Sequence, residues 1–164
     1  MTDELIGKPS TRGQAMQRVQ LGLRSLANQL HRLNDAVGSH VDLLPGDLEV
    51  LDVIAREGLT SPRQVVAATG LHPATLTGIL DRLERGGWLQ RRPDPDDRRR
   101  VIVQAITERG GELVRLYAPM TKALNQICSG YSPEQLALIV DFLERAAAAG
   151  TDAARQVRNQ KDGA

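Results

Sequence analysis

The feature that most constrains the fold of this chain is a change of hydrophobic period just after residue 87. Before this point, apolar residues recur at the three- and four-residue spacing of amphipathic helices, and after it they alternate as in strands. Residues 88–91 and 101–105 therefore predict two strands, and the Pro- and Asp-rich residues 92–100 predict the turn that joins them. The expected fold is mainly α with one small β-hairpin.

Two helices lead into this hairpin. Ser61 forms a capping-box pattern with Gln64 and predicts the start of a short helix over residues 62–69. A second helix begins at Pro73, and its apolar face consists of Leu76, Ile79, Leu80 and Leu83. A short helix, a glycine-containing turn, a longer helix and a hairpin, in this order, form the winged helix-turn-helix arrangement. In that arrangement the second helix enters the major groove of DNA.

Four further helices complete a set of six. Residues 16–39 carry a heptad-like apolar stripe that includes Val19, Leu23, Leu26 and Leu30. Residues 45–57 predict a shorter helix, and Thr107 can cap a fifth. The Ser-Pro-x-Gln start signal recurs at residues 132–135 and opens a sixth helix with Leu136, Ile139, Val140 and Leu143 inward. The long apolar stripe must be covered, either by the chain's own core or by a second subunit.

The length of 164 residues suggests one domain with short extensions. Residues 1–15 predict a mobile arm, residues 16–150 the folded domain, and residues 151–164 a polar tail. No apolar run is long enough for a transmembrane helix, and the N-terminus lacks the apolar core of a signal peptide. The expected location is therefore the cytoplasm, with no membrane partner.

Positive charge is local in this chain rather than general. The net charge is only +1, which is not the signature of nucleic-acid binding through bulk charge. Residues 85–100, however, hold six arginines against three aspartates, and arginines at a loop tip suit a narrow minor groove. The start of the helix at Pro73 carries small or hydroxyl-bearing side chains, which let a helix approach base edges closely.

Four stretches together make the sequence recognisable: LTGILDRLERGGWL at residues 76–89, DPDDRR at 94–99, VIV at 101–103 and TERG at 107–110. They resemble the MarR (multiple antibiotic resistance regulator) family of winged-helix transcription factors, and a looser likeness runs from residue 16 to 149. The resemblance implies an obligate homodimer. It implies a DNA-binding lobe over about residues 45–106, with dimerisation helices over about 16–40 and 107–149.

The resemblance also implies roles for individual residues. Thr75 and Thr77 would read bases, Arg82 would lie near phosphate, and Asp97 would pair with Arg99, which enters the minor groove. The expected DNA-contacting residues are Ser61, His72, Ala74, Thr75, Thr77, Gly78, Arg82, Arg91, Asp97, Arg98, Arg99 and Arg100. The expected dimer contacts are Val19, Leu23, Leu26, Leu30, Leu136, Ile139, Val140 and Leu143. Gly78 replaces a long polar residue common in the family, and His72 replaces a frequent Ser cap, so the operator sequence stays undefined.

The expected function is a dimeric, sequence-specific transcriptional regulator on double-stranded DNA with a pseudo-palindromic operator. The resemblance favours a repressor, and it implies a small-molecule effector as a second partner, since many family members release DNA on binding one. The alternative is a winged-helix interaction or scaffolding dimer without its own operator, which the near-zero net charge and Gly78 keep open.

No enzyme is predicted, because the sequence has no phosphate-cradling Gly-rich loop, no recognisable Ser/His/Asp set and no zinc signature. The expected catalytic residues, metal ligands and cofactors are therefore none. Cys128 has no cationic neighbour in the sequence to activate its thiol, so a structural or idle role is favoured over oxidant sensing.

Overall fold

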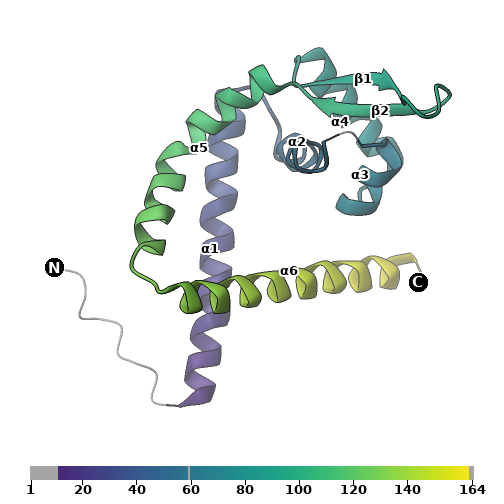
Figure 1. Cartoon of the computed structure of the whole chain (residues 1–164). Coiled ribbons are helices and arrows are strands. Elements are labelled where there is room, and N and C mark those ends of the chain that lie inside the picture. Colours follow the sequence, from purple (N-terminus) through teal and green to yellow (C-terminus); the bar gives the residue numbers. More distant parts are fainter. Residues whose placement is uncertain (1–10, 59, 163–164) are drawn as a thin grey trace. The chain divides into compact units, whose positions relative to one another are not determined.

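The computed structural model of the chain describes residues 11–58 and 60–162. Its elements, in chain order, are α1 (Arg12–His40), α2 (Pro45–Glu57), α3 (Pro62–Thr69), α4 (Pro73–Arg85), β1 (Leu89–Pro93), β2 (Val101–Ala105), α5 (Thr107–Cys128) and α6 (Pro133–Asp162) (Figure 1). The predicted fold class, mainly helical with a small hairpin wing, is confirmed. The chain divides into two compact units, Met1–Glu49 and Val50–Ala164.

The first unit contains α1 and the first turn of α2. Thr11 caps α1, because its side chain accepts a hydrogen bond from the Gln14 backbone N–H at 3.2 Å. The helix consequently begins four residues before the predicted start, and residues 12–15, predicted within the arm, are helical. Residues 1–10 of the predicted arm lie outside the described residues.

The second unit is built on an aliphatic core. The buried side chains come from α2, α3, α4 and the hairpin, and they are Val50, Leu51, Val53, Ile54, Val65, Leu76, Ile79, Leu80, Leu83, Trp88, Leu89, Ile102 and Val103. The four inward residues predicted for α4 are all among them. Gly70 ends α3 in a left-handed conformation with φ of 68°, which turns the chain toward α4.

The hairpin is antiparallel, with Leu89 opposite Ala105 and Pro93 opposite Val101. Thr60 extends the pairing by exchanging two backbone hydrogen bonds with Val103, at N···O distances of 3.2 and 2.7 Å. This bridge ties the segment before α3 to β2. The wing is therefore attached to the helices at its base, whereas its tip projects from them (Figure 1).

The last two helices each differ from the prediction in one respect. Thr107 was predicted to cap α5, but it is the first helical residue, and Ile106 is the N-cap, with no side-chain hydrogen bond. For α6, the difference is in length. At the start of α6, the Ser132 N–H donates to Gln135 Oε1 at 2.8 Å and the Gln135 N–H donates to Ser132 Oγ at 3.3 Å, which confirms the predicted start signal. The helix then continues to Asp162 and includes residues 151–162 of the predicted tail. An alanine run at 146–149 and the absence of a later proline explain this extension.

No helix in the described ranges combines the length and the apolar character that crossing a bilayer requires. Pro119 lies inside α5, and this helix curves along its length (Figure 1). A proline within a helix removes one backbone hydrogen bond and is a recognised cause of bending.

Two glycines of the α4 region give a matched stability test. An added Cβ at Gly78 would have its nearest contact at 3.9 Å, whereas one at Gly86 would lie 2.8 Å from Trp88 Cδ1. Gly78→Ala is therefore expected to stabilise the fold by about 0.5–1 kcal/mol, because alanine loses less backbone entropy in a helix. Gly86→Ala is expected to destabilise it by about 1–3 kcal/mol through overpacking. Urea unfolding measures both, and equal effects of the two substitutions would contradict this account.

Candidate nucleic-acid interface

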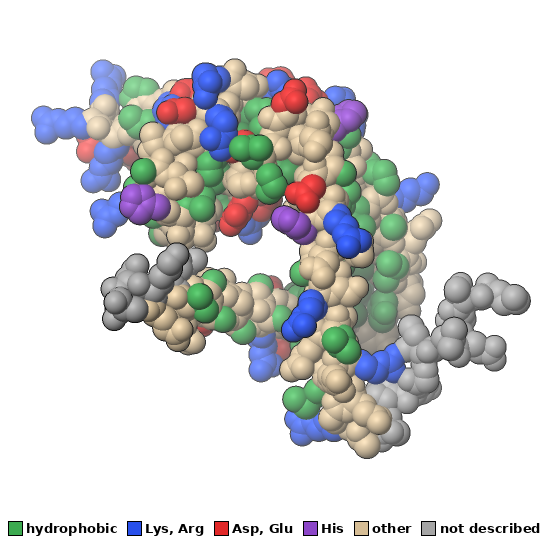
Figure 2. Space-filling view, turned by 180° about the vertical axis from the view of Figure 1, so that it is seen from behind, with side chains coloured by type: hydrophobic (Ala, Val, Ile, Leu, Met, Phe, Trp, Pro, Cys, Tyr) green, Lys and Arg blue, Asp and Glu red, His purple; other side chains and the backbone are tan. Residues whose placement is uncertain are grey.

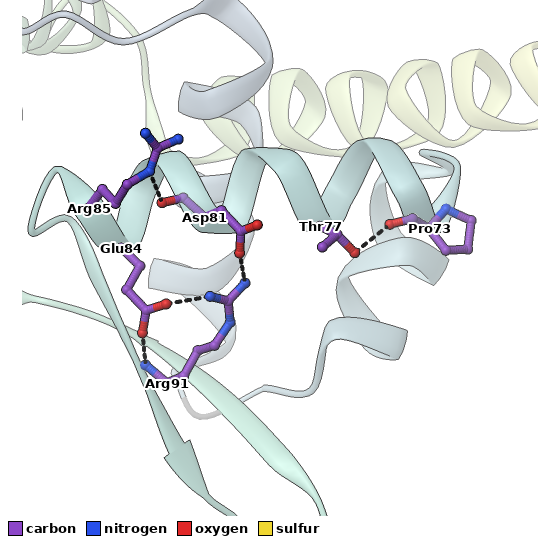
Figure 3. Close-up of polar contacts among 6 residues, drawn as sticks. All are labelled: Pro73, Thr77, Asp81, Glu84, Arg85 and Arg91. Atoms are coloured by element: carbon purple, nitrogen blue, oxygen red, sulfur yellow. Dashed lines mark hydrogen bonds and ion pairs between the residues drawn. The ribbon is translucent and has the colours of Figure 1, made fainter.

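Helix α4 presents a neutral, small-residue surface at its N-terminal end. His72 caps the helix, since its Nδ1 accepts a hydrogen bond from the Ala74 N–H at 3.2 Å. Ala74, Thr75 and Thr77 are exposed, and Gly78 is half-buried. The Thr77 hydroxyl donates to the Pro73 carbonyl at 3.0 Å and keeps its acceptor capacity for another group (Figure 3).

Ser61 lies at the start of α3, where the predicted capping box forms in full. Its hydroxyl donates to Gln64 Oε1 at 2.7 Å and accepts from the Gln64 N–H at 3.3 Å. The local role of Ser61 is thus to fix the first turn of α3. Its expected proximity to a DNA backbone stays a prediction.

Asp97 organises the tip of the wing through two contacts. Its Oδ1 accepts the backbone N–H of Arg99 at 3.1 Å, and its Oδ2 pairs with Nε of Arg100 at 3.3 Å. The prediction that Asp97 holds the Arg99 guanidinium is therefore wrong, because the turn brings the side chain of Arg100 to the carboxylate instead. Asp97 fixes Arg99 by its main chain only.

The side chains of Arg98 and Arg99 are exposed at this tip. Within the part of the chain that the structure describes, neither guanidinium forms an ion pair or a hydrogen bond. Figure 2 shows Lys and Arg side chains gathered at a protruding end of the molecule. Two charges at the wing tip are thus available to an external anion.

Arg91, predicted to contact DNA, is engaged inside the lobe (Figure 3). Its Nη2 pairs with Asp81 Oδ1 at 2.7 Å, and its Nη1 pairs with Glu84 Oε2. Burial lowers the pKa of the guanidinium, but hydrogen bonds and charge from these two carboxylates outweigh burial and raise the pKa above its ordinary value. The donors of Arg91 are directed at α4 in this structure, and its direct contact with DNA stays a prediction.

Sequence reasoning assigned no role to Arg109, which connects α5 to the end of α4. Its Nη1 donates to the Gly86 carbonyl at 2.9 Å, and its guanidinium lies 4.0 Å from the ring centroid of Trp88. Its Nη2 also pairs with Glu112 at 3.3 Å. The sequence feature that could have indicated this role is the Thr-Glu-Arg-Gly stretch itself. In the structure its arginine contacts the Gly86-Gly87 turn, where the wing begins.

The residues predicted to form a dimer remain poorly covered. On α1, Val19, Leu26 and Leu30 are exposed and Leu23 is half-buried. On α6, Ile139, Val140 and Leu143 are exposed and Leu136 is half-buried. Each helix thus carries an apolar stripe facing solvent, where the exposed area costs free energy until another surface covers it.

The described residues contain no group of three His, Cys, Asp or Glu side chains arranged to hold a metal ion. Cys128 is a free, exposed thiol at the end of α5.

Comparison with known proteins places this geometry among transcription factors. A profile described as MarR family matches residues 41–100. The uncharacterised HTH-type transcriptional regulator YcgE of Bacillus subtilis is 32% identical over 129 residues, which cover 79% of this chain and 83% of YcgE. The HTH-type transcriptional repressor NicR of Pseudomonas putida is 36% identical over 73 residues, covering 44% of this chain and 46% of NicR. The structure of Streptococcus pneumoniae FabT in complex with DNA matches with a TM-score of 0.63 at 25% identity, covering 84% of this chain and 98% of FabT.

Arg109→Ala tests the connection between α5 and the turn. The substitution removes a charge-assisted hydrogen bond and a cation–π contact, and we expect it to destabilise the fold by about 1–3 kcal/mol. Since Trp88 is the single tryptophan, its fluorescence emission should shift to longer wavelength as water reaches the exposed ring. The control is Arg56→Ala, which removes an exposed pair with Asp52 and should cost less than about 1 kcal/mol. Unchanged emission in Arg109→Ala would contradict the contact.

Proposed function

The chain belongs to the MarR family of transcriptional regulators, and we propose that it acts by binding double-stranded DNA in a sequence-specific manner. The observation that carries the proposal is the pairing of two surfaces in one lobe. One is the exposed, neutral face of α4, and the other is the wing tip with unpaired Arg98 and Arg99. FabT, whose structure was solved on DNA, supports it. The relatives are named as regulators and repressors rather than enzymes.

In the proposed complex, α4 lies in the major groove. The groove is about 12 Å wide, which admits one helix when the side chains facing the bases are small. Ala74, Thr75, Thr77 and Gly78 meet this condition, and threonine can both hydrogen-bond to bases and contact the thymine methyl. Beside them, near the sugar-phosphate backbone of the DNA, would lie Ser61, His72 and Arg82.

The wing tip is proposed to contact the adjacent minor groove through Arg98 and Arg99, with Asp97 and Arg100 holding the turn in shape. The negative potential of a narrow minor groove attracts guanidinium groups. Phosphate and groove contacts of this kind fix the position of a protein on the duplex, whereas base contacts by α4 specify the sequence.

We also propose that the functional unit is a homodimer assembled through the exposed stripes of α1 and α6. Each buried Val, Leu or Ile side chain contributes about 1.5–3 kcal/mol, so eight such residues per subunit offer ample driving force. The lobe of residues 45–106 would then bind one half-site, flanked by dimerisation helices on both sides. Two-fold symmetry requires a pseudo-palindromic operator with half-sites about 34–36 Å apart.

We propose that the protein represses transcription, since its relative NicR is named as a repressor. A dimer covering its operator would block access of other proteins to that DNA. Release by a small-molecule effector is proposed from the family resemblance, and it would operate as a population shift toward lobe positions that do not fit the groove.

Sequence-specific binding to DNA can be tested directly. Selection from a random duplex pool should yield a two-fold symmetric consensus, and log K for that duplex should fall linearly with log salt, by about 0.9 per phosphate contacted. Candidate metabolites added to the complex should reveal an effector by loss of binding. If no sequence is enriched and no salt-dependent complex forms, DNA binding is contradicted and the interaction or scaffolding dimer is favoured.

The role of the wing can be tested at Arg99. Arg99→Ala should weaken binding to the selected duplex and make the salt slope shallower by about 0.9, because one cation is lost. Light scattering should still give twice the chain mass of 17.9 kDa, since Arg99 lies outside the proposed dimer contacts. Arg155→Ala on α6 also removes an exposed charge and should leave the slope unchanged. Wild-type affinity in Arg99→Ala would show that the wing assignment is wrong.

A further inference from the structure

We propose that Arg91 is a positioning residue for DNA binding, which offsets part of the negative charge of two carboxylates on α4 and fixes strand β1 to that helix. This inference rests on the proposed function, because it concerns how α4 and the wing are presented to DNA together. It gives Arg91 an indirect role in place of the direct contact with DNA that the sequence predicts.

The two carboxylates continue the surface that is proposed to face DNA. Asp81 lies four residues after Thr77, so the two side chains share one face of α4, and Glu84 follows one turn later. Figure 3 shows Thr77 and Asp81 along the same side of the helix. The side chain of Asp81 is 51% exposed, so an unpaired carboxylate at this position would repel an approaching phosphate group.

Arg91 reaches both carboxylates from the neighbouring strand. One nitrogen of its guanidinium is directed to Asp81 Oδ1 and the other to Glu84 Oε2, a use that suits its planar fork of donors. Its side chain is only 28% exposed, less than either carboxylate partner. The charge of Arg91 is therefore directed at the protein rather than at solvent.

The main chain of Arg91 takes part in the same contact. Its backbone N–H donates to Glu84 Oε1 at 3.2 Å, so Glu84 binds both the main chain and the side chain of one residue (Figure 3). Strand β1 is thereby held against the third turn of α4. Since β1 leads to the wing tip, this contact also sets the separation between the recognition surface of α4 and Arg98 and Arg99.

Neighbouring Arg92 has the opposite character. It is exposed, and within the described ranges its side chain makes no ion pair or hydrogen bond. The two residues carry the same side chain one position apart on one strand, so they form a natural pair for comparison. A role based on charge alone predicts equal effects of removing either, whereas a positioning role predicts a larger effect at Arg91.

The test measures affinity for the selected duplex at several salt concentrations. Arg91→Gln should weaken binding at least about tenfold and more than Arg92→Gln does, with the salt slope changed by less than the 0.9 that one phosphate contact contributes. The combination of Arg91→Gln with Asp81→Asn and Glu84→Gln should recover affinity to within about threefold of wild type. The three amide side chains of this variant can still hydrogen-bond to one another and to the backbone N–H at position 91, so β1 stays against α4 while the charges are removed. A loss of binding caused by misfolding of the lobe would not be recovered.

A charge-matched control separates local neutralisation from a change in net charge. Arg91→Gln combined with Asp141→Asn and Glu144→Gln removes two exposed carboxylates with the same spacing on α6, and it should remain as weak as Arg91→Gln alone. Equal recovery by the two triple variants would overturn the proposal. So would a slope reduced by about 0.9 in Arg91→Gln without recovery, which would establish a direct phosphate contact.

The outcomes also separate this inference from the proposed function. A wild-type chain that binds no duplex overturns the proposed function, and this inference with it. A wild type that binds, together with an Arg91→Gln variant of unchanged affinity, overturns the inference alone. Circular dichroism of each variant shows whether the helices are intact, and the Asp81→Asn/Glu84→Gln variant with Arg91 retained should bind no more than about threefold more weakly than wild type.

Discussion

Burial of one side of α4 is the constraint on which the rest of the structure depends. Leu76, Ile79, Leu80 and Leu83 are at most 5% exposed, and each contributes about 1.5–3 kcal/mol by leaving water. Because these four residues fix the rotation of the helix about its axis, its opposite side must face solvent. Rotation of the helix about its axis would expose part of this apolar face and bury polar side chains from the opposite side, which makes the observed orientation the stable one.

The arginines of the lobe show that position, not residue type, decides what a positive charge does. Arg91 and Arg109 are both directed inward, one to two carboxylates and one to an aromatic ring and a carbonyl group. Arg98 and Arg99 lie on a turn whose own carboxylate is occupied by Arg100 and by a backbone N–H. At the wing tip, charge is thus left for an external partner because the turn geometry has already satisfied the acidic neighbour, which explains how a chain with a net charge of +1 can present a positive tip.

Features set by a few consecutive residues were predictable from the sequence, and those set by distant residues were not. The two Ser-Pro-x-Gln starts and the inward face of α4 depend on neighbours within one or two turns, and the structure has them as predicted. Apart from Glu112, which is three residues from Arg109, the partners of Arg91 and Arg109 lie 7 to 23 residues away, and only the tertiary path through the Gly86-Gly87 turn brings them together. The length of α6 was missed for a different reason, since Gly150 suggests an end that the surrounding alanines override.

These contacts divide the proposed interface into parts with separate tasks. The N-terminal face of α4 carries no charged side chain before Asp81, so it can add base discrimination but little general affinity for DNA. The wing tip carries charge without base-reading groups, so it can add affinity that is nearly independent of sequence. Arg91 connects the two parts, because its ion pairs with the carboxylates at the end of α4 reduce the repulsion between this end and the DNA phosphates that the wing approaches. Specificity and affinity can then be altered independently by substitution, provided that this connection is kept.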